Sequence, residues 1–332
     1  MPKLMISLDN KILDSNSMVA KRMVDYGVYD RLYIIVPNTI DKFVELSPEV
    51  KVWGIGGNKI KQFIKLKKKG EIIIKKYVID LITTQDPFFT GLLGLILKKK
   101  TKINLEIQLH GDFFGNSYYK KSGFKNFIQY FLAKYIVLYN ADKIRVVGER
   151  IKNNLLELGV NEDKIELRAI EVNKEYIESY QIKTDLKKKY SAYNKIFLSI
   201  GRLELVKNID FLIDIFAEVI KEKKDYLLLV VGSGSQKNIL IEKVKMLGLE
   251  NNIKFEDWTD DHISYIKTCD VVLFPSLSEG YGMVPMEANM AGKKVIMSDV
   301  GVANYELKPS ENVIILPIDY KERFINEIKK YE

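Results

Sequence analysis

The stretch PSLSEGYGMVPMEANMAGKKVIMSDVG, residues 275–301, decides the fold of this 332-residue chain. Apolar runs at 271–274 and 294–297 are predicted to be buried strands. Between them, Pro285 suits the first turn of a helix, because proline has no N–H to leave unpaired and its φ is already helical. Gly292 suits the residue just past the helix end, where a positive φ is common. The stretch is therefore predicted to fold as strand, loop, short helix, turn and strand.

Two carboxylates in this stretch stand eight residues apart, at Glu279 and Glu287. The predicted elements place Glu279 in the loop and Glu287 in the first helical turn. Both side chains, together with the free backbone N–H groups of the helix N-terminus, can face one ligand. Carboxylates accept hydrogen bonds from hydroxyl groups, and helix N-termini bind phosphates, so the arrangement suits a molecule that carries both groups.

Short β-rich runs alternate with helical patterns along the whole chain. Near-continuous apolar strands of this kind are typical of parallel sheets that are covered on both faces. Two such series, separated by a polar linker at about 168–194, predict two Rossmann-like, doubly wound α/β domains over 1–168 and 169–332. The predicted strands are 4–8, 32–36, 50–53, 77–83, 103–109, 143–147, 195–200, 226–231, 253–256, 271–274, 294–297 and 313–316.

Composition limits the class of protein. The charged fraction of 29% and the hydrophobic fraction of 47% are ordinary for a soluble globular protein. Cys269 is the single cysteine, so no internal disulfide forms, which fits a reducing compartment. His110 and His262 are too few for a histidine metal cluster. The apolar run 88–97 is too short to span a membrane, and the N-terminus has the pattern of a strand rather than a signal peptide, so a cytoplasmic location is expected.

The net charge is uneven along the chain. Residues 1–168 hold 29 basic and 18 acidic side chains, a net charge of +11, whereas the remaining residues hold 23 and 26, a net charge of −3. A basic domain indicates an anionic partner, either nucleic acid, a membrane surface or an acidic acceptor. Because no known nucleic-acid module accompanies the charge, nucleic acid is not expected to be the partner.

Aromatic and basic residues share one helical pattern at 118–136, and the stretch 60–76 adds many lysines. Two interpretations are open. The helix either contacts an anionic membrane, which would make the protein peripheral at the inner face of the cytoplasmic membrane, or it packs its apolar stripe against the sheet and leaves the lysines solvated. The apolar stripe consists of Phe124, Phe127, Ile128, Phe131 and Tyr135.

The segment SIGRLELVKN, residues 199–208, follows the end of a predicted strand with Arg202 and Lys207. Ligands of doubly wound sheets bind at the carboxyl ends of the strands. A guanidinium fork and a lysine point charge could together neutralise a diphosphate. The alternative is that both are solvated surface charges, but their register with the two-glutamate loop favours a ligand.

The segment LLLVVGSGSQ, residues 227–236, ends a strand with Gly232 and Gly234. Lys237 stands where a dinucleotide fingerprint would have its third glycine, so that fingerprint is incomplete. We interpret the segment as a tight turn whose backbone N–H groups approach a base or a phosphate.

The segment QLHGDFFG, residues 108–115, places His110 at a strand end of the first half. Its imidazole could donate to a hydroxyl or orient an acceptor, and Gly111 allows a close approach of the backbone. Asp112 could fix the orientation of the imidazole. The alternative is a structural histidine at a strand terminus. The neighbouring strand end, with Asp86, is interpreted as helix capping.

Several common catalytic motifs do not occur in this sequence. There is no Asp-x-Asp pair, no Walker loop, no G-x-S-x-G elbow and no H-E-x-x-H helix. No metal site and no cofactor are therefore expected.

Taken together, these motifs resemble the retaining glycosyltransferases of the GT-B fold, specifically family four, also called group 1. The match is strongest over 196–306, where GRLELVKN precedes EGYGMVPMEANMAG with its two glutamates. The first half matches more loosely, through LHGD, DPFFTGLLG and VVGERIKNNLLELGVNEDKI. The resemblance implies two Rossmann-like domains that face a cleft, an N-terminal acceptor-binding domain and a C-terminal donor-binding domain.

The resemblance also implies a metal-independent, retaining transfer of a sugar from a nucleoside-diphosphate sugar. Glu287 would accept hydrogen bonds from the ribose hydroxyls, and Glu279 would hold a hydroxyl of the transferred sugar. Arg202 and Lys207 would stabilise the charge on the leaving diphosphate, and His110 would reach the donor sugar and the acceptor. Backbone groups would complete the donor site at Gly232, Gly280, Gly282, Met283 and Val284.

The implied acceptor is a glycan or a lipid-linked molecule, in the synthesis of a cell-surface polysaccharide or glycolipid. A catalytically silent GT-B scaffold that binds a nucleotide sugar and a GT-B nucleotide-sugar epimerase are the alternatives. The chain departs from the family pattern at 15–17, where a glycine-rich turn is usual, and at 168–173, where Pro-Asn-Gly is common. It also carries one helix after about residue 320, whereas relatives usually carry a further helix that crosses back to the first domain.

Overall fold

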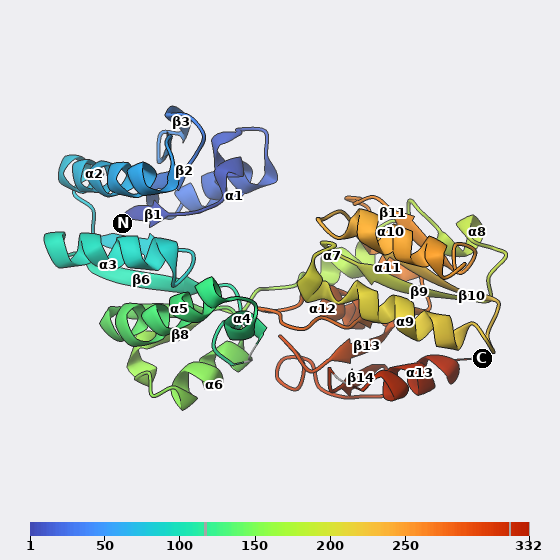
Figure 1. The fold of residues 1–332 in the computed structure, drawn as a ribbon. Helices are drawn as coiled ribbons and strands as arrows, with labels where there is room; N and C mark the ends of the chain where they lie inside the picture. The colour runs from blue at the N-terminus through green and yellow to red at the C-terminus, as the bar shows by residue number, and fades with distance from the viewer. Residues whose placement is uncertain (116–117, 319, 332) are drawn as a thin grey trace. The chain divides into compact units, whose positions relative to one another are not determined.

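The computed structural model describes residues 1–115, 118–318 and 320–331. They form two compact units, each built around its own β-sheet (Figure 1). The first unit comprises Met1–Val147 and Ile151–Ala169, and the second unit comprises Gly148–Arg150 and Ile170–Glu332. In both units helices connect parallel strands, so the predicted Rossmann-like α/β fold class is confirmed.

The sheet of the first unit has eight strands in the order β3-β4-β2-β1-β5-β6-β7-β8. All neighbours are parallel except β3 and β4, which form an antiparallel hairpin at one edge. The sequence prediction lacks β3 and β8, and the strand predicted over 77–83 begins only at Leu81, because helix α2 continues through Tyr77. The strands are β1 (Pro2–Ile6), β2 (Arg31–Pro37), β3 (Lys42–Ser47), β4 (Val50–Ile55), β5 (Leu81–Thr84), β6 (Asn104–Leu109), β7 (Lys143–Val146) and β8 (Ile165–Leu167).

One face of this sheet is apolar where helices pack on it. Gly94 of α3 lies so close to Thr84 and Leu105 that a Cβ at Gly94 would be 2.7 Å and 2.8 Å from their side chains. Because side chains alternate along a strand, Thr83 and Glu106 point to the opposite face. The expectation of continuous apolar strands is therefore wrong for β5 to β8, whose second face is polar. The helices of this unit are α1 (Met18–Gly27), α2 (Lys59–Tyr77), α3 (Phe89–Thr101), α4 (Tyr118–Lys121), α5 (Phe124–Leu132), the π-helix η2 (Ala133–Leu138) and α6 (Glu149–Glu157), whose first residues belong to the second unit.

The sheet of the second unit has six strands, all parallel, in the order β11-β10-β9-β12-β13-β14. All six strands predicted for this half are present. They are β9 (Lys195–Ile200), β10 (Tyr226–Val231), β11 (Ile253–Glu256), β12 (Val271–Phe274), β13 (Lys294–Ser298) and β14 (Val313–Leu316).

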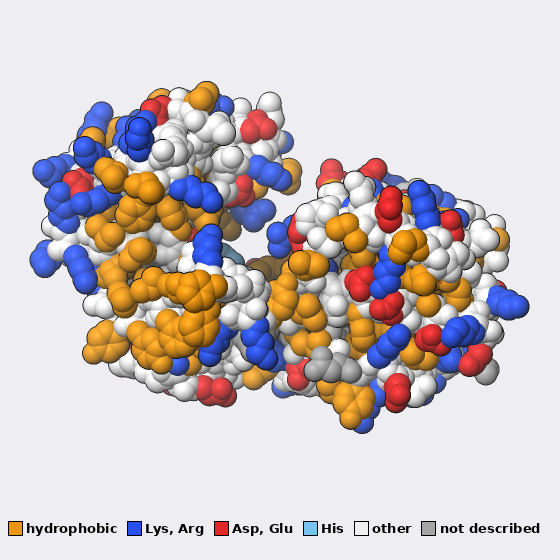
Figure 2. Space-filling view, in the orientation of Figure 1, with side chains coloured by type: hydrophobic (Ala, Val, Ile, Leu, Met, Phe, Trp, Pro, Cys, Tyr) orange, Lys and Arg blue, Asp and Glu red, His pale blue; other side chains and the backbone are white. Residues whose placement is uncertain are grey.

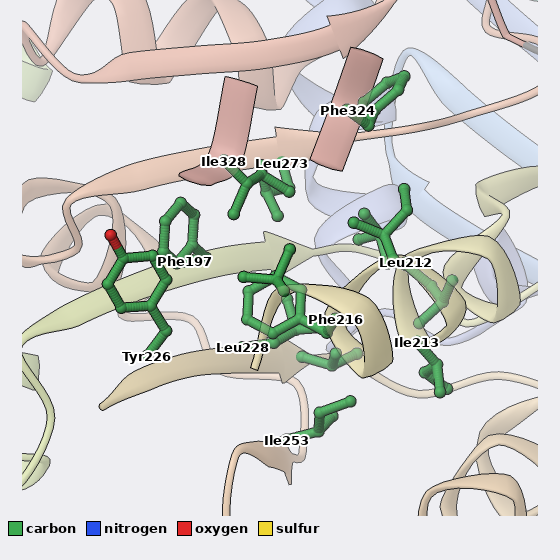
Figure 3. Packing of buried hydrophobic residues seen from close by; sticks show 14 of the residues in the cluster. Phe197, Leu212, Ile213, Phe216, Tyr226, Leu228, Ile253, Leu273, Phe324 and Ile328 are labelled. Carbon is green, nitrogen blue, oxygen red and sulfur yellow. The ribbon is translucent and has the colours of Figure 1, made fainter. Parts of the chain in front are cut away.

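The core of the second unit contains aromatic rings from the sheet and its helices (Figure 3). Phe197 of β9 packs against Phe216 of α9 and Tyr226 of β10, with ring centres 5.5 Å and 5.2 Å apart. Phe324 of α13 closes the cluster from the C-terminal helix. The single cysteine, Cys269, is also buried, and burial raises the pKa of its thiol to about 12.

The stretch predicted as a linker, 168–194, contains two short helices that belong to the second unit, α7 (Lys174–Ser179) and α8 (Leu186–Lys189). Ile177 and Leu186 are buried, and Lys267 donates hydrogen bonds to three carbonyl groups between Ile177 and Tyr180. Most of this polar stretch is therefore a packed part of the unit. The other elements are η4 (Leu205–Lys207), α9 (Ile209–Val219), α10 (Lys237–Met246), α11 (His262–Thr268), α12 (Met283–Met290) and α13 (Lys321–Lys329).

Candidate functional site

Helix α12 begins and ends as its sequence predicts. Pro285 lies in the first turn, and Gly292, just beyond the helix, has a φ of +69°. Gly282 is the N-cap residue, with a φ of +102° that favours glycine. The helix thus starts at Met283, two residues before Pro285. As a result, Glu287 is the fifth residue of α12 and lies in its second turn, which corrects the expectation of a first-turn position.

Lys207 and Glu279 form an ion pair between the two loops singled out in the sequence. Lys207 Nζ lies 2.5 Å from Glu279 Oε1, and the two side chains are only 17% and 14% exposed. The same ammonium group lies 5.0 Å from the ring centre of Phe274, close enough for a cation–π interaction. Because little water screens the pair, its electrostatic field acts strongly on a nearby ligand. Glu279 Oε2 has no recorded hydrogen bond within the described residues, so it can accept one from a ligand.

Hydrogen bonds hold the loop of Lys207 against the loop of Glu279. The N–H of Leu277 donates to the carbonyl of Val206 at 2.8 Å. Asn208 Nδ2 donates to the carbonyl of Pro275 at 3.3 Å. Lys207 itself ends the 3₁₀ turn η4, so its backbone position is fixed on both sides. The ion pair is thus a preorganised feature at the carboxyl ends of β9 and β12.

Arg202 follows β9 in the same loop as Lys207. Its side chain is exposed, and neither an ion pair nor a side-chain hydrogen bond is recorded for it in the described part of the chain. The guanidinium group can therefore turn toward an anion without first breaking a contact.

Gly232 has a structural role that the sequence does not indicate. Its N–H donates to the carbonyl of Glu256 at 3.0 Å, so that group is already used within the sheet. A Cβ at Gly232 would lie 1.8 Å from the carbonyl oxygen of Gly201. The glycine therefore permits two strand-end loops to touch. Its own N–H is used in the sheet, and its place in the donor site stays a prediction.

Glu287 contacts a histidine and, through it, a tryptophan, both of which the sequence reasoning missed. His262 Nε2 lies 3.5 Å from Glu287 Oε1, and hydrogen bonding to this carboxylate raises the pKa of His262. The exposed indole of Trp258 stacks on the imidazole, with ring centres 5.9 Å apart. The sequence feature that could have identified Trp258 and His262 is their position after β11, at the carboxyl edge of the sheet.

The N-terminus of α12 presents backbone donors near these side chains. No hydrogen bond is recorded for the N–H groups of Gly282, Met283 and Val284 within residues 1–115, 118–318 and 320–331. Gly280 precedes them in the same half-exposed loop. Unpaired donors at a helix N-terminus favour an anionic group, because the helix dipole adds positive potential there.

His110 lies in the first unit, at the end of β6. Its Nε2 is 3.2 Å from Gln108 Oε1, whereas Asp112 Oδ1 accepts from Gly115 and Asn154. Gln108, rather than Asp112, thus supplies the hydrogen bond recorded for the imidazole. Because Gln108 Oε1 is an acceptor, Nε2 carries the proton and Nδ1 is left as the acceptor.

The surroundings of His110 keep it neutral. Although the side chain is exposed, the protein around the ring displaces enough water to lower its pKa. The positive charges of Arg145 and Arg22 lower it further. With its N–H on Gln108, the neutral imidazole can accept a hydrogen bond or a proton from a hydroxyl group at Nδ1, rather than donate to one as expected from the sequence. Its role toward an acceptor stays a prediction.

Asp86 lies at the start of α3 as predicted, although the N-cap residue of this helix is Phe88. Its carboxylate accepts hydrogen bonds from the N–H of Phe88 at 2.7 Å and from the hydroxyl of Thr90 at 2.7 Å, at the start of α3. Burial raises the pKa of this carboxyl group.

Two classes of feature have no candidate among the described residues. No group of three or more His, Cys, Asp or Glu side chains there could hold a metal ion. Likewise, none of the helices in these ranges has the length and apolar character needed to cross a membrane.

Comparison with known families gives matches to both halves of the chain. The family model described as glycosyl transferases group 1 matches residues 182–332. The model described as glycosyltransferase family 4 matches residues 37–167.

Several curated proteins are similar over much of the chain. A glycosyltransferase of Methanocaldococcus jannaschii is 29% identical over 286 residues, which is 82% of this chain and 72% of that protein. The alpha-monoglucosyldiacylglycerol synthase of Streptococcus pneumoniae is 29% identical over 237 residues, or 68% of this chain and 53% of that enzyme. The capsular polysaccharide biosynthesis glycosyltransferase CapM of Staphylococcus aureus is 27% identical over 62% of this chain and 57% of that protein. This chain therefore spans little more than half of the last two relatives.

Solved structures share the fold over nearly the whole chain. Sucrose-phosphate synthase of Thermosynechococcus elongatus has a TM-score of 0.78 at 19% identity, covering 99% of this chain and 89% of that one. HepE of Anabaena, in complex with UDP and glucose, has a TM-score of 0.72 at 17% identity, with the same coverage.

Proposed function

Because this chain belongs to the group 1, family 4 glycosyltransferases of the GT-B fold, we propose that it transfers a sugar from a nucleoside-diphosphate sugar to an acceptor. The observation that carries the proposal is the buried pair of Lys207 and Glu279 at the carboxyl ends of β9 and β12. A diphosphate leaving group and a sugar hydroxyl are the two chemical groups that such a pair can serve. The complex of HepE with UDP and glucose, in a protein of the same fold, supports this class of donor.

Each residue of the site has a defined task in this proposal. Lys207 and Arg202 stabilise the negative charge that develops on the diphosphate as the glycosidic bond breaks. Glu279 remains paired with Lys207 through Oε1 and accepts a hydrogen bond from a sugar hydroxyl with Oε2. Glu287 accepts a ribose hydroxyl, next to His262. The α12 amides bind the phosphate oxygens.

We propose further that the transfer retains the anomeric configuration and uses no metal ion or cofactor. The support is the cationic loop, which supplies the positive charge that a metal ion would otherwise provide. The assay is a panel of nucleotide sugars with and without EDTA, followed by NMR of the product anomer. Loss of transfer in EDTA, restored by a divalent cation, would overturn metal independence, and an inverted product would overturn retention.

The same assay separates the alternative functions. A silent scaffold binds a nucleotide sugar without releasing nucleoside diphosphate, and an epimerase changes the sugar configuration. Transfer to an acceptor or to water contradicts both.

The exposed indole of Trp258 is positioned to stack on the donor base. It is linked to the proposed ribose ligand Glu287 through His262. Base–aromatic stacking contributes roughly 1–3 kcal/mol, so Trp258→Ala is expected to weaken donor binding about 5-fold or more, with little change in kcat. Isothermal titration with the donor measures the effect.

The control for Trp258 is Tyr320→Ala, which removes another half-exposed aromatic side chain from the same unit. It is expected to leave donor affinity unchanged. Equal affinity of Trp258→Ala and the natural chain would show that the indole does no more than cover His262.

The acceptor that we propose is a glycan or a lipid-linked molecule, used in polysaccharide or glycolipid synthesis. The similarity to a glycolipid synthase and to a capsular polysaccharide enzyme supports this class. We also propose that the protein works in the cytoplasm, at the membrane that carries such acceptors.

An exposed aromatic-lysine surface on α5 supports membrane contact. Phe124 is 80% exposed, and Phe127, Ile128 and Tyr135 are also exposed, so the interpretation that this stripe packs against the sheet is wrong for them. Apolar side chains gather beside lysines on this part of the first unit (Figure 2). Such a surface suits an anionic bilayer, which attracts lysines and accepts apolar side chains.

Replacing Phe124, Phe127 and Ile128 together by serine tests the membrane contact. Burying each of these side chains contributes roughly 1.5–3 kcal/mol, so the triple variant is expected to lose about 100-fold or more in affinity for anionic vesicles. Flotation with vesicles containing phosphatidylglycerol, at low salt, measures binding. The double variant Val28→Ser/Tyr29→Ser is the control, since both side chains lie outside this surface and are more exposed than Phe127 and Ile128. No flotation of the natural chain at low salt would contradict the proposal.

A further inference from the structure

A cavity in the first unit takes no part in the donor chemistry. It has a volume of about 280 Å³ and is lined by strands β1, β5, β6 and β7 and by α1. It lies on the polar face of the sheet, opposite the face that α3 covers. The buried side chains Thr83, Glu106 and Gln108 form part of its wall and are joined by hydrogen bonds of 2.8 Å to 3.1 Å.

The cavity has a surplus of positive charge. Its lining holds four cationic side chains and two carboxylates, a net charge of +2 with the histidine neutral. The cations are Lys3, Arg22, Arg145 and Arg168, and the carboxylates are Asp30 and Glu106.

The carboxylates near the cavity already form ion pairs or hydrogen bonds with other side chains. Asp30 pairs with Lys3 at 2.5 Å. Glu166, the cross-strand neighbour of Arg145, pairs with Lys143 and with Arg168, each at 2.6 Å. Glu106 accepts from its two polar neighbours through Oε1.

Two arginines are left without a carboxylate. No ion pair is recorded for Arg22 or Arg145 in the described ranges, and Arg145 Nε is buried without a hydrogen-bond partner there. A guanidinium group presents planar donors that match phosphate and carboxylate oxygens. Burial is the main cause of the lowered pKa of His110, and the charges of Arg145 and Arg22 lower that pKa further, as a positive potential at this place would.

We propose that this cavity binds the phosphate or carboxylate group of an anionic sugar in the acceptor. Arg145 and Arg22 bind the anion. The polar groups of Gln108 and Thr83 are hydrogen-bonded to Glu106, to each other and to His110, so they hold the wall of the site in place. A second hollow shares His110, Arg22 and Gln85 with the cavity and reaches the carboxyl edge of the sheet. The anion site therefore lies beside the histidine proposed to meet the acceptor. The identification of the bound anionic sugar as the acceptor rests on the proposed transferase function, whereas the binding of an anion in this cavity does not.

Isothermal titration of the full chain tests the site with four probes: glucose, glucuronate, glucose 6-phosphate and inorganic phosphate. We expect glucuronate or glucose 6-phosphate to bind at least about 10-fold more tightly than glucose. Arg145→Gln is expected to remove about 10-fold or more of that affinity, since hydrogen bonds to charged groups are the strong ones. Arg22→Gln, on an exposed position of α1 that tolerates substitution, is expected to weaken the same ligands. Lys134→Gln, which removes a charge elsewhere in the unit, is the control.

Three outcomes would overturn the proposal. They are equal affinity for glucose and its anionic relatives, unchanged anion affinity in both arginine variants, and tight binding of inorganic phosphate that glucose 6-phosphate cannot displace. The last outcome would make the cavity a site for free phosphate.

Donor titration keeps this test separate from the transferase proposal. Arg145-dependent binding of an anionic sugar without any donor turnover would overturn the transfer reaction and support the site. Donor turnover without anion binding would overturn the site alone.

Discussion

Lys207→Met lowers kcat for sugar transfer by about 100- to 1000-fold. The ammonium group sits in a poorly hydrated pair with Glu279, 2.5 Å away, and backbone hydrogen bonds hold its loop against the loop of Glu279. Removing one preorganised charge or donor that acts on a developing anion costs about 2.7–4 kcal/mol in activation free energy. Steady-state kinetics with saturating donor measure the change.

Two companions of Lys207→Met separate catalysis from stability. Lys207→Arg keeps the positive charge and should recover part of kcat. Lys221→Met removes an exposed lysine that pairs with the neighbouring Glu218, away from the loops of the site, and should leave kcat unchanged. Because Lys207→Met also leaves Glu279 without its partner, the melting temperature must be compared. A folded Lys207→Met enzyme with full kcat would contradict the role assigned to this lysine.

Gly232→Ala prevents the second unit from folding, or lowers its free energy of unfolding by more than about 4 kcal/mol. The added Cβ would lie 1.8 Å from the carbonyl oxygen of Gly201, at a φ of +151° that side chains rarely adopt. The position of a Cβ is fixed by its own backbone, and the atom that it would meet is a backbone oxygen, so no side-chain rotation can relieve the clash. Relief would require separating two loops joined by the hydrogen bonds Gly201 N–H to Val231 and Leu203 N–H to Ser233, of 3.0 Å and 2.8 Å.

Gly248→Ala is the matched control for this prediction. Gly248 also has a positive φ, +66°, but an added Cβ would meet no atom within 4 Å. Its cost should be the conformational one alone, about 1–2 kcal/mol. Urea unfolding followed by the fluorescence of Trp258, the one tryptophan described in the second unit, measures both variants. Similar losses at the two positions would show that the loop contact matters little.

Local chemistry explains what the sequence could predict. Pro285 and Gly292 act through their own backbone preferences, so both ends of α12 follow from the residues themselves. The pair of Lys207 and Glu279 could be anticipated because both follow neighbouring parallel strands, and such strand ends meet at one edge.

The remaining features depend on which elements become neighbours. His262 reaches Glu287 only because α11 and α12 pack in the same unit, a fact that spacing along the chain does not reveal. A strand-end glycine has the same sequence signature whether it approaches a phosphate or another loop, so the close contact of Gly232 with the carbonyl of Gly201 could not be predicted. The polar face of β5 to β8 could have been predicted, because polar and apolar residues alternate in NLEIQL and KIRV. It was missed because the Leu and Ile residues of these strands are also typical of strands that are buried on both faces.

The burial of Cys269 makes the natural chain behave, toward thiol-specific reagents, like a protein without cysteine. A thiol with a pKa of about 12 holds almost no thiolate at neutral pH, and the thiolate is the reacting species. Maleimide dyes would then attach only to cysteines placed on purpose. Tyr139 and Met246, one in each unit and about 80% exposed, offer two such positions. Energy transfer between dyes at these positions would report, in real time and in solution, how the two units respond to a nucleotide sugar.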